Sequence, residues 1–185
     1  LWAVPLGATA AIVSKALAVG LGKNFLNPAA LGRAVLLLLP SLRPAALRTA
    51  EGNFLMGYLD GSLGEAASLL LLAGAVYLAI RRLLPLWITP AYLIAAFFTG
   101  LALPHCDAAA VLAWGGTLLG AAFLSADPVT TPMGRWLQLL FGIACGVGCT
   151  LLAYYGWGIG GICCGILVVN FLCRAAEWAA WHIGL

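Results

Sequence analysis

Residues 136–173 read WLQLLFGIACGVGCTLLAYYGWGIGGICCGILVVNFLC, and no charged side chain interrupts them. A helix crosses the hydrocarbon core of a bilayer with about 20 apolar residues, so this stretch is long enough for two spans. Tyrosine and tryptophan favour the membrane interface, and closely spaced glycines permit a turn. The stretch therefore predicts a pair of transmembrane helices that is broken at residues 154–158.

The rest of the sequence is also strongly apolar. Of its 185 residues, 64% are hydrophobic and 8% are charged, whereas about a quarter of the residues in a typical soluble domain are charged. We therefore predict an all-α, polytopic transmembrane helix bundle of about six or seven spans, with residues 1–185 forming a single transmembrane domain. The further apolar stretches are residues 1–21, 24–42, 66–80, 83–104 and 108–126.

Charge excludes one class of function and leaves the membrane orientation open. Nine Lys and Arg against six Asp and Glu give a net charge of +3, which is too little for a nucleic-acid-binding protein. Arg81 and Arg82 mark a cytoplasmic loop by the positive-inside rule, but Arg43 and Arg48 follow the preceding apolar stretch. The sequence begins with Leu1 and shows no readable signal peptide, so we expect a fragment of a protein with earlier helices.

Two polar, proline-bearing interruptions are the residues least expected in a bilayer. They are residues 23–28, KNFLNP, and residues 125–132, SADPVTTP. Proline removes a backbone donor and biases the preceding residue away from the helical conformation. Asn27-Pro28 and Asp127-Pro128 are thus each predicted to end one helical segment and begin another. Irregular backbone at membrane depth is tolerated where protein buries it or a cavity hydrates it, and helix ends there can bind ions.

The two interruptions resemble each other. Gly32-Arg33 follows the first, and Gly134-Arg135 follows the second. This pattern predicts an internal repeat with halves at about residues 1–80 and 83–185, of the kind that builds a midplane site in transport proteins. The alternative is that both are ordinary turns between helices.

Cysteines and glycines concentrate in the long apolar run. Cys145 and Cys149 are four residues apart, a spacing that places two thiols on one helix face, but no nearby His or carboxylate completes a metal site. We interpret them as small packing residues. Glycine pairs four residues apart predict close helix contacts, and they are Gly142 and Gly146, Gly156 and Gly160, and Gly161 and Gly165.

Three segments together resemble the NqrB/RnfD family. Residues 20–34, GLGKNFLNPAALGRA, look like the first signature of that family. Residues 52–67 are similar to its G-N-x-x-x-G-S-x-G-E segment. By residue type, Asp60 or Ser62 caps the helix that follows, with Glu65 in its first turn, or Glu65 binds a proton or cation. Residues 126–132, ADPVTTP, resemble its T-D-P-V-T/S-x-P loop. The resemblance covers essentially the whole chain.

The resemblance implies a membrane subunit of a redox-driven ion pump in the bacterial inner membrane. One candidate is RnfD of the Rnf complex, which couples ferredoxin and NAD to ion pumping, and the other is NqrB of the sodium-translocating NADH:quinone oxidoreductase. Residues 60–65 favour RnfD. Such a subunit carries FMN or riboflavin, works with other membrane and peripheral subunits, and transports Na⁺ or H⁺. The sequence holds no catalytic constellation of its own.

The family's S-G-A-T motif, which carries covalent FMN on its threonine, is missing here. Between residues 33 and 52 the one threonine is Thr49, and it follows Ala-Leu-Arg. We expect the flavin ring and the ion path to be lined instead by polar residues of the two interruptions. The competing functions are a cofactor-free channel or transporter and a non-catalytic membrane scaffold. The candidate lining residues are Asn24, Asn27, Asp127, Thr130 and Thr131.

Overall fold

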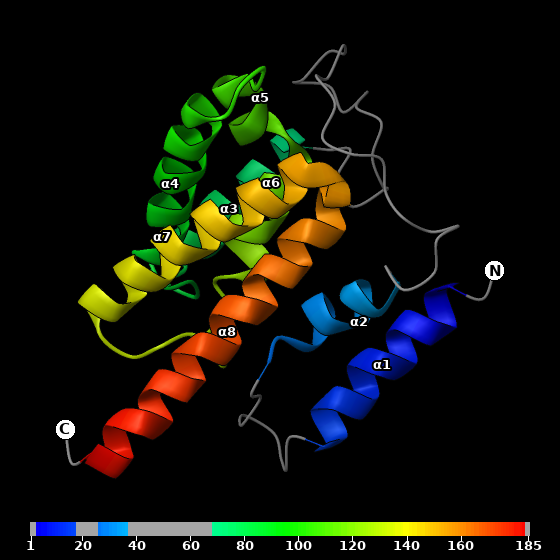
Figure 1. Cartoon of the computed structure of the whole chain (residues 1–185), viewed down its shortest axis with the longest axis vertical. Coiled ribbons are helices and arrows are strands. Elements are labelled where there is room, and N and C mark those ends of the chain that lie inside the picture. Colours follow the sequence, from blue (N-terminus) through cyan, green and yellow to red (C-terminus); the bar gives the residue numbers. More distant parts are fainter. Residues whose placement is uncertain (1–2, 18–25, 37–67, 184–185) are drawn as a thin grey trace.

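The computed structural model describes residues 3–17, 26–36 and 68–183, and every regular element in these ranges is helical (Figure 1). The predicted all-α class is confirmed. The elements are α1 (Ala3–Leu17), α2 (Pro28–Leu36), α3 (Ser68–Ile80), α4 (Ile88–Ala102), α5 (Ala108–Ala113), α6 (Gly115–Leu119), the π-helix η2 (Gly120–Leu124), α7 (Arg135–Leu152), the π-helix η3 (Ala153–Trp157) and α8 (Gly158–Ile183).

Helices α7 and α8 form a V whose apex is the predicted break (Figure 1). The π-helix η3 occupies the apex, and Gly158 follows it with φ of 49°, a conformation that glycine adopts without steric cost. Within the described residues, two segments are long and apolar enough to cross a membrane, Arg135–Tyr155 and Gly160–Ala179. The two predicted helices and the break between them are therefore confirmed.

Glycines set the distance between α7 and its neighbours. An ideal Cβ on Gly142 would lie 2.7 Å from the Ile88 carbonyl oxygen of α4, and Gly146 faces the Tyr92 carbonyl one turn further along both helices. Helices α4 and α7 therefore run parallel. On the other side of α7, a Cβ on Gly165 would lie 2.8 Å from Cys149 Sγ. These contacts confirm the predicted role of the glycine pairs at 142 and 146 and at 161 and 165.

The stretch 108–126 is helical in pieces and not as one span. Asp107 caps α5 by accepting a hydrogen bond from the Ala109 backbone N–H at 2.9 Å. Trp114 then adopts an extended conformation, with ψ of 125°, and its ring lies over Gly116. A Cβ on that glycine would approach the ring to 3.0 Å. The chain bends here because the ring of Trp114 fills the space beside a residue that has no side chain.

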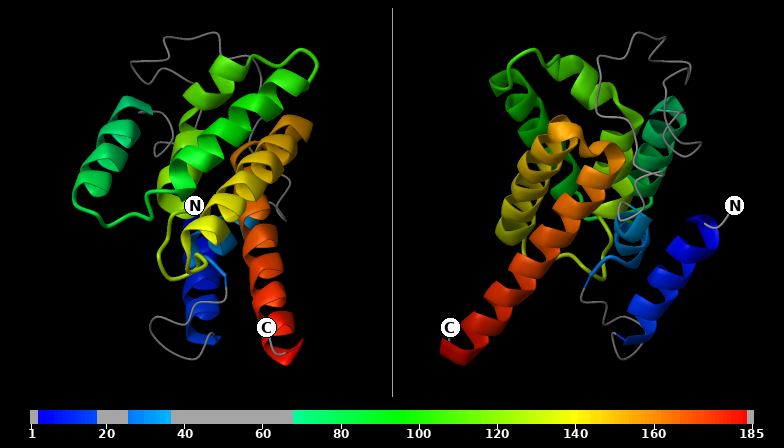
Figure 2. Two further views of the ribbon diagram at one scale, coloured as in Figure 1. Left: turned by 90° about the vertical axis from the view of Figure 1, so that its left-hand side faces the viewer. Right: turned by 45° about the vertical axis from the view of Figure 1, so that its right-hand side comes forward.

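The remaining helices lie along the sides of this core. Helix α3 is set apart from α7 and α8 (Figure 2), and Ser68 Oγ donates to the Ala113 carbonyl at 3.2 Å. Helices α1 and α2 run antiparallel, with Gly7 against Gly32, and α2 packs on α8. The number of spans and the division into repeat halves at 1–80 and 83–185 remain predictions.

Candidate functional site where the two broken segments meet

The first interruption is organised by the side chain of Asn27. Its Oδ1 accepts hydrogen bonds from the backbone N–H groups of Ala29 at 3.0 Å and Ala30 at 3.1 Å. This is an N-cap on α2, with Pro28 at the first helical position, where a missing N–H has no cost. The prediction that a helix begins at Asn27-Pro28 is confirmed.

The same side chain joins the two interruptions. Asn27 Nδ2 donates to the Leu124 carbonyl oxygen at 2.8 Å, and the whole side chain is buried. Leu124 ends the π-helix η2, where the carbonyls of the last turn have no partner within the helix. An amide on a segment far away in the sequence thus completes the end of a broken helix, three residues before Asp127.

The second interruption is a compact turn. Asp127 Oδ1 accepts from the Val129 N–H at 3.1 Å, and the Asp127 carbonyl accepts from the N–H groups of Thr130 and Thr131 at 3.1 and 3.2 Å. Both threonines are buried. Asp127 and Asn27 therefore use the same turn, in which the side-chain oxygen accepts from the N–H two residues later.

The prediction that a helix begins at Asp127-Pro128 is wrong. The segment 128–131 forms turns, and the next helix, α7, begins at Arg135 after Gly134, whose φ is 105°. The cause is the second proline, Pro132, which lacks an N–H and biases Thr131 away from the helical conformation. The first interruption has no second proline, so its helix continues.

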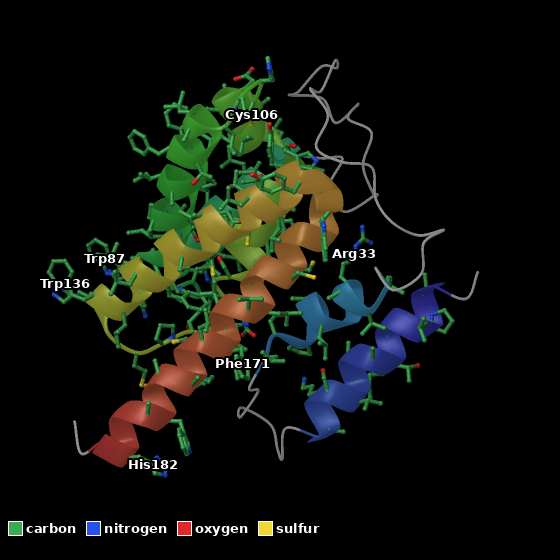
Figure 3. The ribbon with its side chains drawn as sticks, viewed as in Figure 1. Arg33, Trp87, Cys106, Trp136, Phe171 and His182 are labelled. Carbon is green, nitrogen blue, oxygen red and sulfur yellow. The ribbon has the colours of Figure 1, made fainter. Side chains whose placement is uncertain are left out.

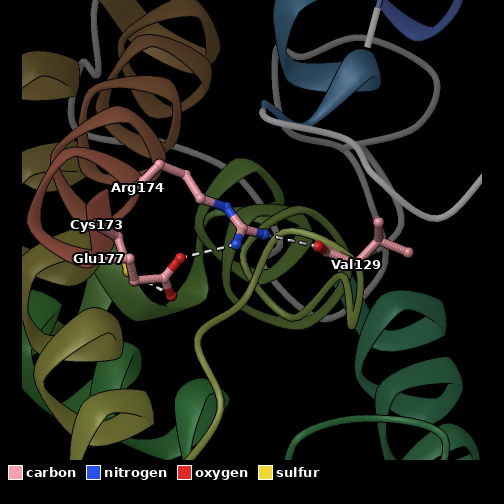
Figure 4. Close-up of polar contacts among 4 residues, drawn as sticks. All are labelled: Val129, Cys173, Arg174 and Glu177. Carbon is pink, nitrogen blue, oxygen red and sulfur yellow. Dashed lines mark hydrogen bonds and ion pairs between the residues drawn. The ribbon is translucent and has the colours of Figure 1, made fainter. Parts of the chain in front are cut away.

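An arginine from α8 holds this turn in place (Figure 4). Arg174 Nη2 donates to the Val129 carbonyl at 3.1 Å, and its Nη1 pairs with Glu177 Oε2 at 2.8 Å. The ion pair offsets the positive charge beside the turn. Sequence reasoning missed both residues, because charges near the end of an apolar run are usually interfacial anchors.

Asn170 is a second residue that sequence reasoning missed. It lies on α8 one turn before Arg174, its exposed fraction is 0%, and its Nδ2 and Oδ1 have no hydrogen-bond partner in the described part of the chain. A polar residue inside a predicted span was the available signal, because such residues in membranes are costly and usually functional.

Several predicted site residues lie outside the described residues. Asn24 and Thr49 are among them, as is the whole segment 52–65 with Glu65. The Asn27–Leu124 hydrogen bond brings the buried side chains of Asn27, Thr130 and Thr131 into one region, and the partly buried Asp127 lies in the same turn as the threonines. Their role in binding remains a prediction.

The buried cysteines lie in the core of the bundle. Cys145 and Cys149 face α8, and Cys149 Sγ donates to the Ile162 carbonyl at 3.3 Å. Within the described ranges, no group of three His, Cys, Asp or Glu side chains is placed to hold a metal ion. The structure places these thiols as packing residues.

Residues 45–177 match the NQR2, RnfD, RnfE family. One relative is a subunit, designated D, of the ion-translocating oxidoreductase complex of Stutzerimonas stutzeri. The chain is 31% identical to it over 144 residues, a match that covers 71% of this chain and 40% of that protein. Another is a subunit, designated B, of the Na⁺-translocating NADH-quinone reductase of Chromohalobacter salexigens, at 30% identity over 82% of this chain and 46% of that protein.

A third relative belongs to the Na⁺-translocating ferredoxin:NAD⁺ oxidoreductase complex of Acetobacterium woodii, in which it is the subunit designated D. The identity is 28% over 82% of this chain and 56% of that protein. The chain thus spans about half the length of the curated relatives it matches. The family match covers most of the chain, including the Asp127 turn, α7 and most of α8. The chain is therefore a member of the NQR2, RnfD, RnfE family of membrane proteins.

Proposed function

We propose that the chain belongs to a membrane subunit of an ion-translocating electron transport complex of the Rnf type. The observation that carries the proposal is the family match over residues 45–177, together with relatives named as subunits of ion-translocating and Na⁺-translocating oxidoreductase complexes. The proposed location is the bacterial inner membrane, which the chain crosses several times. The subunit acts with other membrane and peripheral subunits and is not a catalyst alone.

The proposed ion path runs through the junction of the two interruptions. Broken helices place backbone carbonyls and neutral side-chain oxygens at membrane depth, where they can replace the hydration shell of an ion. Thr130 and Thr131 supply buried hydroxyls, and Asp127 supplies a carboxylate beside them. Asn24 and Asn27 complete the proposed lining, and Asn27 acts by holding the two segments together.

The Asn27 amide is not free to bind a flavin. Its donor and its acceptor are both used by backbone groups, and one Asp127 oxygen is used by Val129. An isoalloxazine ring needs such groups free along its polar edge. The hydroxyl oxygens of Thr130 and Thr131 stay candidates for contact with the FMN or riboflavin of the complex, and Thr49 is the candidate for covalent attachment within residues 33–52.

The cofactor is tested on the purified, denatured chain. In-gel flavin fluorescence and mass spectrometry across residues 43–52 report covalent flavin directly. Fluorescence that survives denaturation, with added FMN mass on Thr49, supports covalent attachment. An unmodified mass leaves non-covalent flavin or the cofactor-free transporter, which the broken helices also suit. Absorption of the native chain before denaturation separates these two outcomes, because a transporter purifies colourless.

The role of the junction is tested with Asp127→Asn in the assembled complex. Asparagine keeps the turn, because its side-chain oxygen also accepts from the Val129 N–H and the backbone carbonyl still accepts from the Thr130 hydroxyl. It removes the charge and the second oxygen, which accepts from Thr130 Oγ1 at 3.4 Å. We expect ion transport driven by electron transfer to fall, because ionisable residues at membrane depth usually serve ion or proton transport. Unchanged transport and electron transfer in the variant complex would indicate a scaffold.

A further inference from the structure

The side-chain amide of Asn170 is buried and has no hydrogen-bond partner among the described residues. It lies in the middle of α8, fully buried, and both of its polar side-chain atoms lack partners. Buried amides are nearly always satisfied, and an exception in a folded protein is usually explained by a water, an ion or a ligand. The groups around Asn170 determine whether a water, an ion or a ligand binds there.

Two contacts on either side of Asn170 locate it. Eight residues earlier, Ile162 packs against Gly120 at the start of η2, where a Cβ on the glycine would lie 2.6 Å from Ile162 Cγ2. Four residues later, Arg174 donates to the Val129 carbonyl. Residues 162, 166, 170 and 174 follow one face of the helix. Asn170 therefore lies on the face of α8 between these two contacts, which reach the start of η2 and the Asp127 turn, and α2 packs on the same helix.

The segment from η2 to the Asp127 turn is rich in neutral oxygen atoms. Ser125 Oγ donates its hydrogen to the Ala121 carbonyl at 3.0 Å, and Thr130 Oγ1 is 3.4 Å from both the Asp127 carbonyl and Asp127 Oδ2. A hydroxyl that donates keeps its lone pairs as acceptors. Both hydroxyls are buried, so their oxygens remain available to a bound group.

The charges around the segment favour a cation. Asp127 contributes a carboxylate, and the positive charge of Arg174 is offset by its ion pair with Glu177. Oxygen ligands from unwound backbone and uncharged side chains are those that sodium uses in membrane transporters. An anion would instead need free N–H groups, and those of residues 129–131 are used by Asp127.

We propose that Asn170 Oδ1 is a ligand of a buried monovalent-cation site, with sodium as its occupant, between α8 and residues 124–130. The choice of a transported cation rests on the proposed function. The site adds a residue of α8 to the ion path, so that the last described helix binds the ion together with the broken segment. Asn170 Nδ2 donates to a water that the ion retains.

The test is thermal unfolding of the purified full chain in detergent, followed by tryptophan fluorescence in sodium chloride or choline chloride at equal ionic strength. With sodium at about ten times its Kd, binding to the folded state raises the unfolding midpoint by about 3–6 °C. Asn170→Leu has the same branched arrangement of side-chain heavy atoms, with larger methyl groups, and removes the ligand, so its midpoint is the same in both salts. Asn170→Ala serves as the second variant.

Ser68→Ala is the matched control, because Ser68 is also buried but donates to Ala113 on the other side of the bundle. This variant keeps the sodium response. A native chain without a sodium response, or an Asn170→Leu chain that retains it, overturns the proposal and leaves Asn170 as an amide bound to water.

The readout involves no electron transfer, so it separates the two proposals. A chain that binds sodium through Asn170 but assembles with no redox partner keeps the site and refutes the proposed function. A chain that assembles into an active complex but shows no sodium response refutes the site alone.

Discussion

Single side chains form hydrogen bonds with the backbone groups that lack a helical partner where the helices of this protein break. Asn27 satisfies two N–H groups at the start of α2 and one carbonyl at the end of η2. Asp127 satisfies the Val129 N–H within its own turn. In a bilayer no solvent replaces these bonds, so each residue determines whether its segment can leave the helical conformation. The strongest effects of substitution are expected at such positions.

Replacement of Asn27 separates its two roles. Asn27→Asp keeps the cap on α2 and loses the donor to Leu124, whereas Asn27→Ala loses both. We expect Asn27→Ala to lower the free energy of unfolding by about 2–3 kcal/mol. Asn27→Asp lowers it by at least as much, because a buried carboxylate oxygen then faces the Leu124 carbonyl. Thermal unfolding in detergent measures both. Thr9→Val, which removes an exposed hydroxyl bond within α1, is the control and shifts the midpoint little.

Cys106 is a natural probe of local electrostatics. It lies between α4 and α5, and burial raises the pKa of its thiol, with a further increase from the neighbouring Asp107. Because the thiolate is the reactive form, its alkylation by a maleimide is slower at pH 7 than that of an exposed cysteine and accelerates as the pH rises through the raised pKa. Asp107→Asn speeds the reaction at pH 7, because it removes the negative charge that adds to the effect of burial. An unchanged rate would contradict a contribution of Asp107 to the raised pKa.

Pairs of helices approach closely only where glycine permits it. Helices α4 and α7 meet at Gly142 and Gly146, whose missing side chains leave room for the backbone carbonyls of Ile88 and Tyr92. This contact fixes the start of α7 and therefore the position of the Asp127 turn that precedes it. The position of the turn, and so its proposed function, thus depends on the packing of α4 against α7.

Two glycines of α7 are predicted to respond in opposite ways. Gly142→Ala places a Cβ 2.7 Å from the Ile88 carbonyl and is expected to destabilise the fold by about 1–3 kcal/mol. Gly148 has no atom within 4 Å of an added Cβ, so Gly148→Ala is neutral or stabilises by up to about 1 kcal/mol through helix propensity. Thermal unfolding of both variants, compared with the native chain, checks the pair. Equal effects would show that α4 and α7 do not meet at Gly142.

In the part of the bundle from α3 to α8 that the structure describes, arginines are distributed unevenly between the two ends. The parallel helices α4 and α7 begin at one end, where Trp87 and Trp136 lie (Figure 3) and where Arg81, Arg82 and Arg135 are found. At the opposite end, Tyr154 Oη donates to the Pro104 carbonyl at 2.8 Å. Among the described residues, the loop 103–107 and η3 at that end contain no Lys or Arg.

This asymmetry predicts the orientation in the membrane. By the positive-inside rule, the arginine-bearing end faces the cytoplasm, so Cys106 faces the opposite side. In intact cells a membrane-impermeant maleimide labels Cys106, and it labels Leu83→Cys in a Cys106→Ala background only after the cells are opened. The reverse pattern would invert the orientation.

The class of the fold and the positions at which its helices break or approach closely follow from the amino-acid sequence alone. A continuous apolar run of sufficient length has few alternatives to transmembrane helices, and proline and glycine act locally through their own backbone. The break at residues 154–158, the glycine contacts of α7 and the helix start at Asn27 were all predictable for this reason.

The way in which the helix breaks act together depends on tertiary contacts, which no local sequence pattern contains. Residues far apart in the sequence form the hydrogen bonds from Asn27 to Leu124 and from Arg174 to Val129. They also bury the amide of Asn170, which has no partner among the described residues. Local preferences are set by a residue and its neighbours, whereas the partner of a buried polar group is set by which helices pack against it. That packing is absent from the pattern along the chain and follows only from the folded bundle.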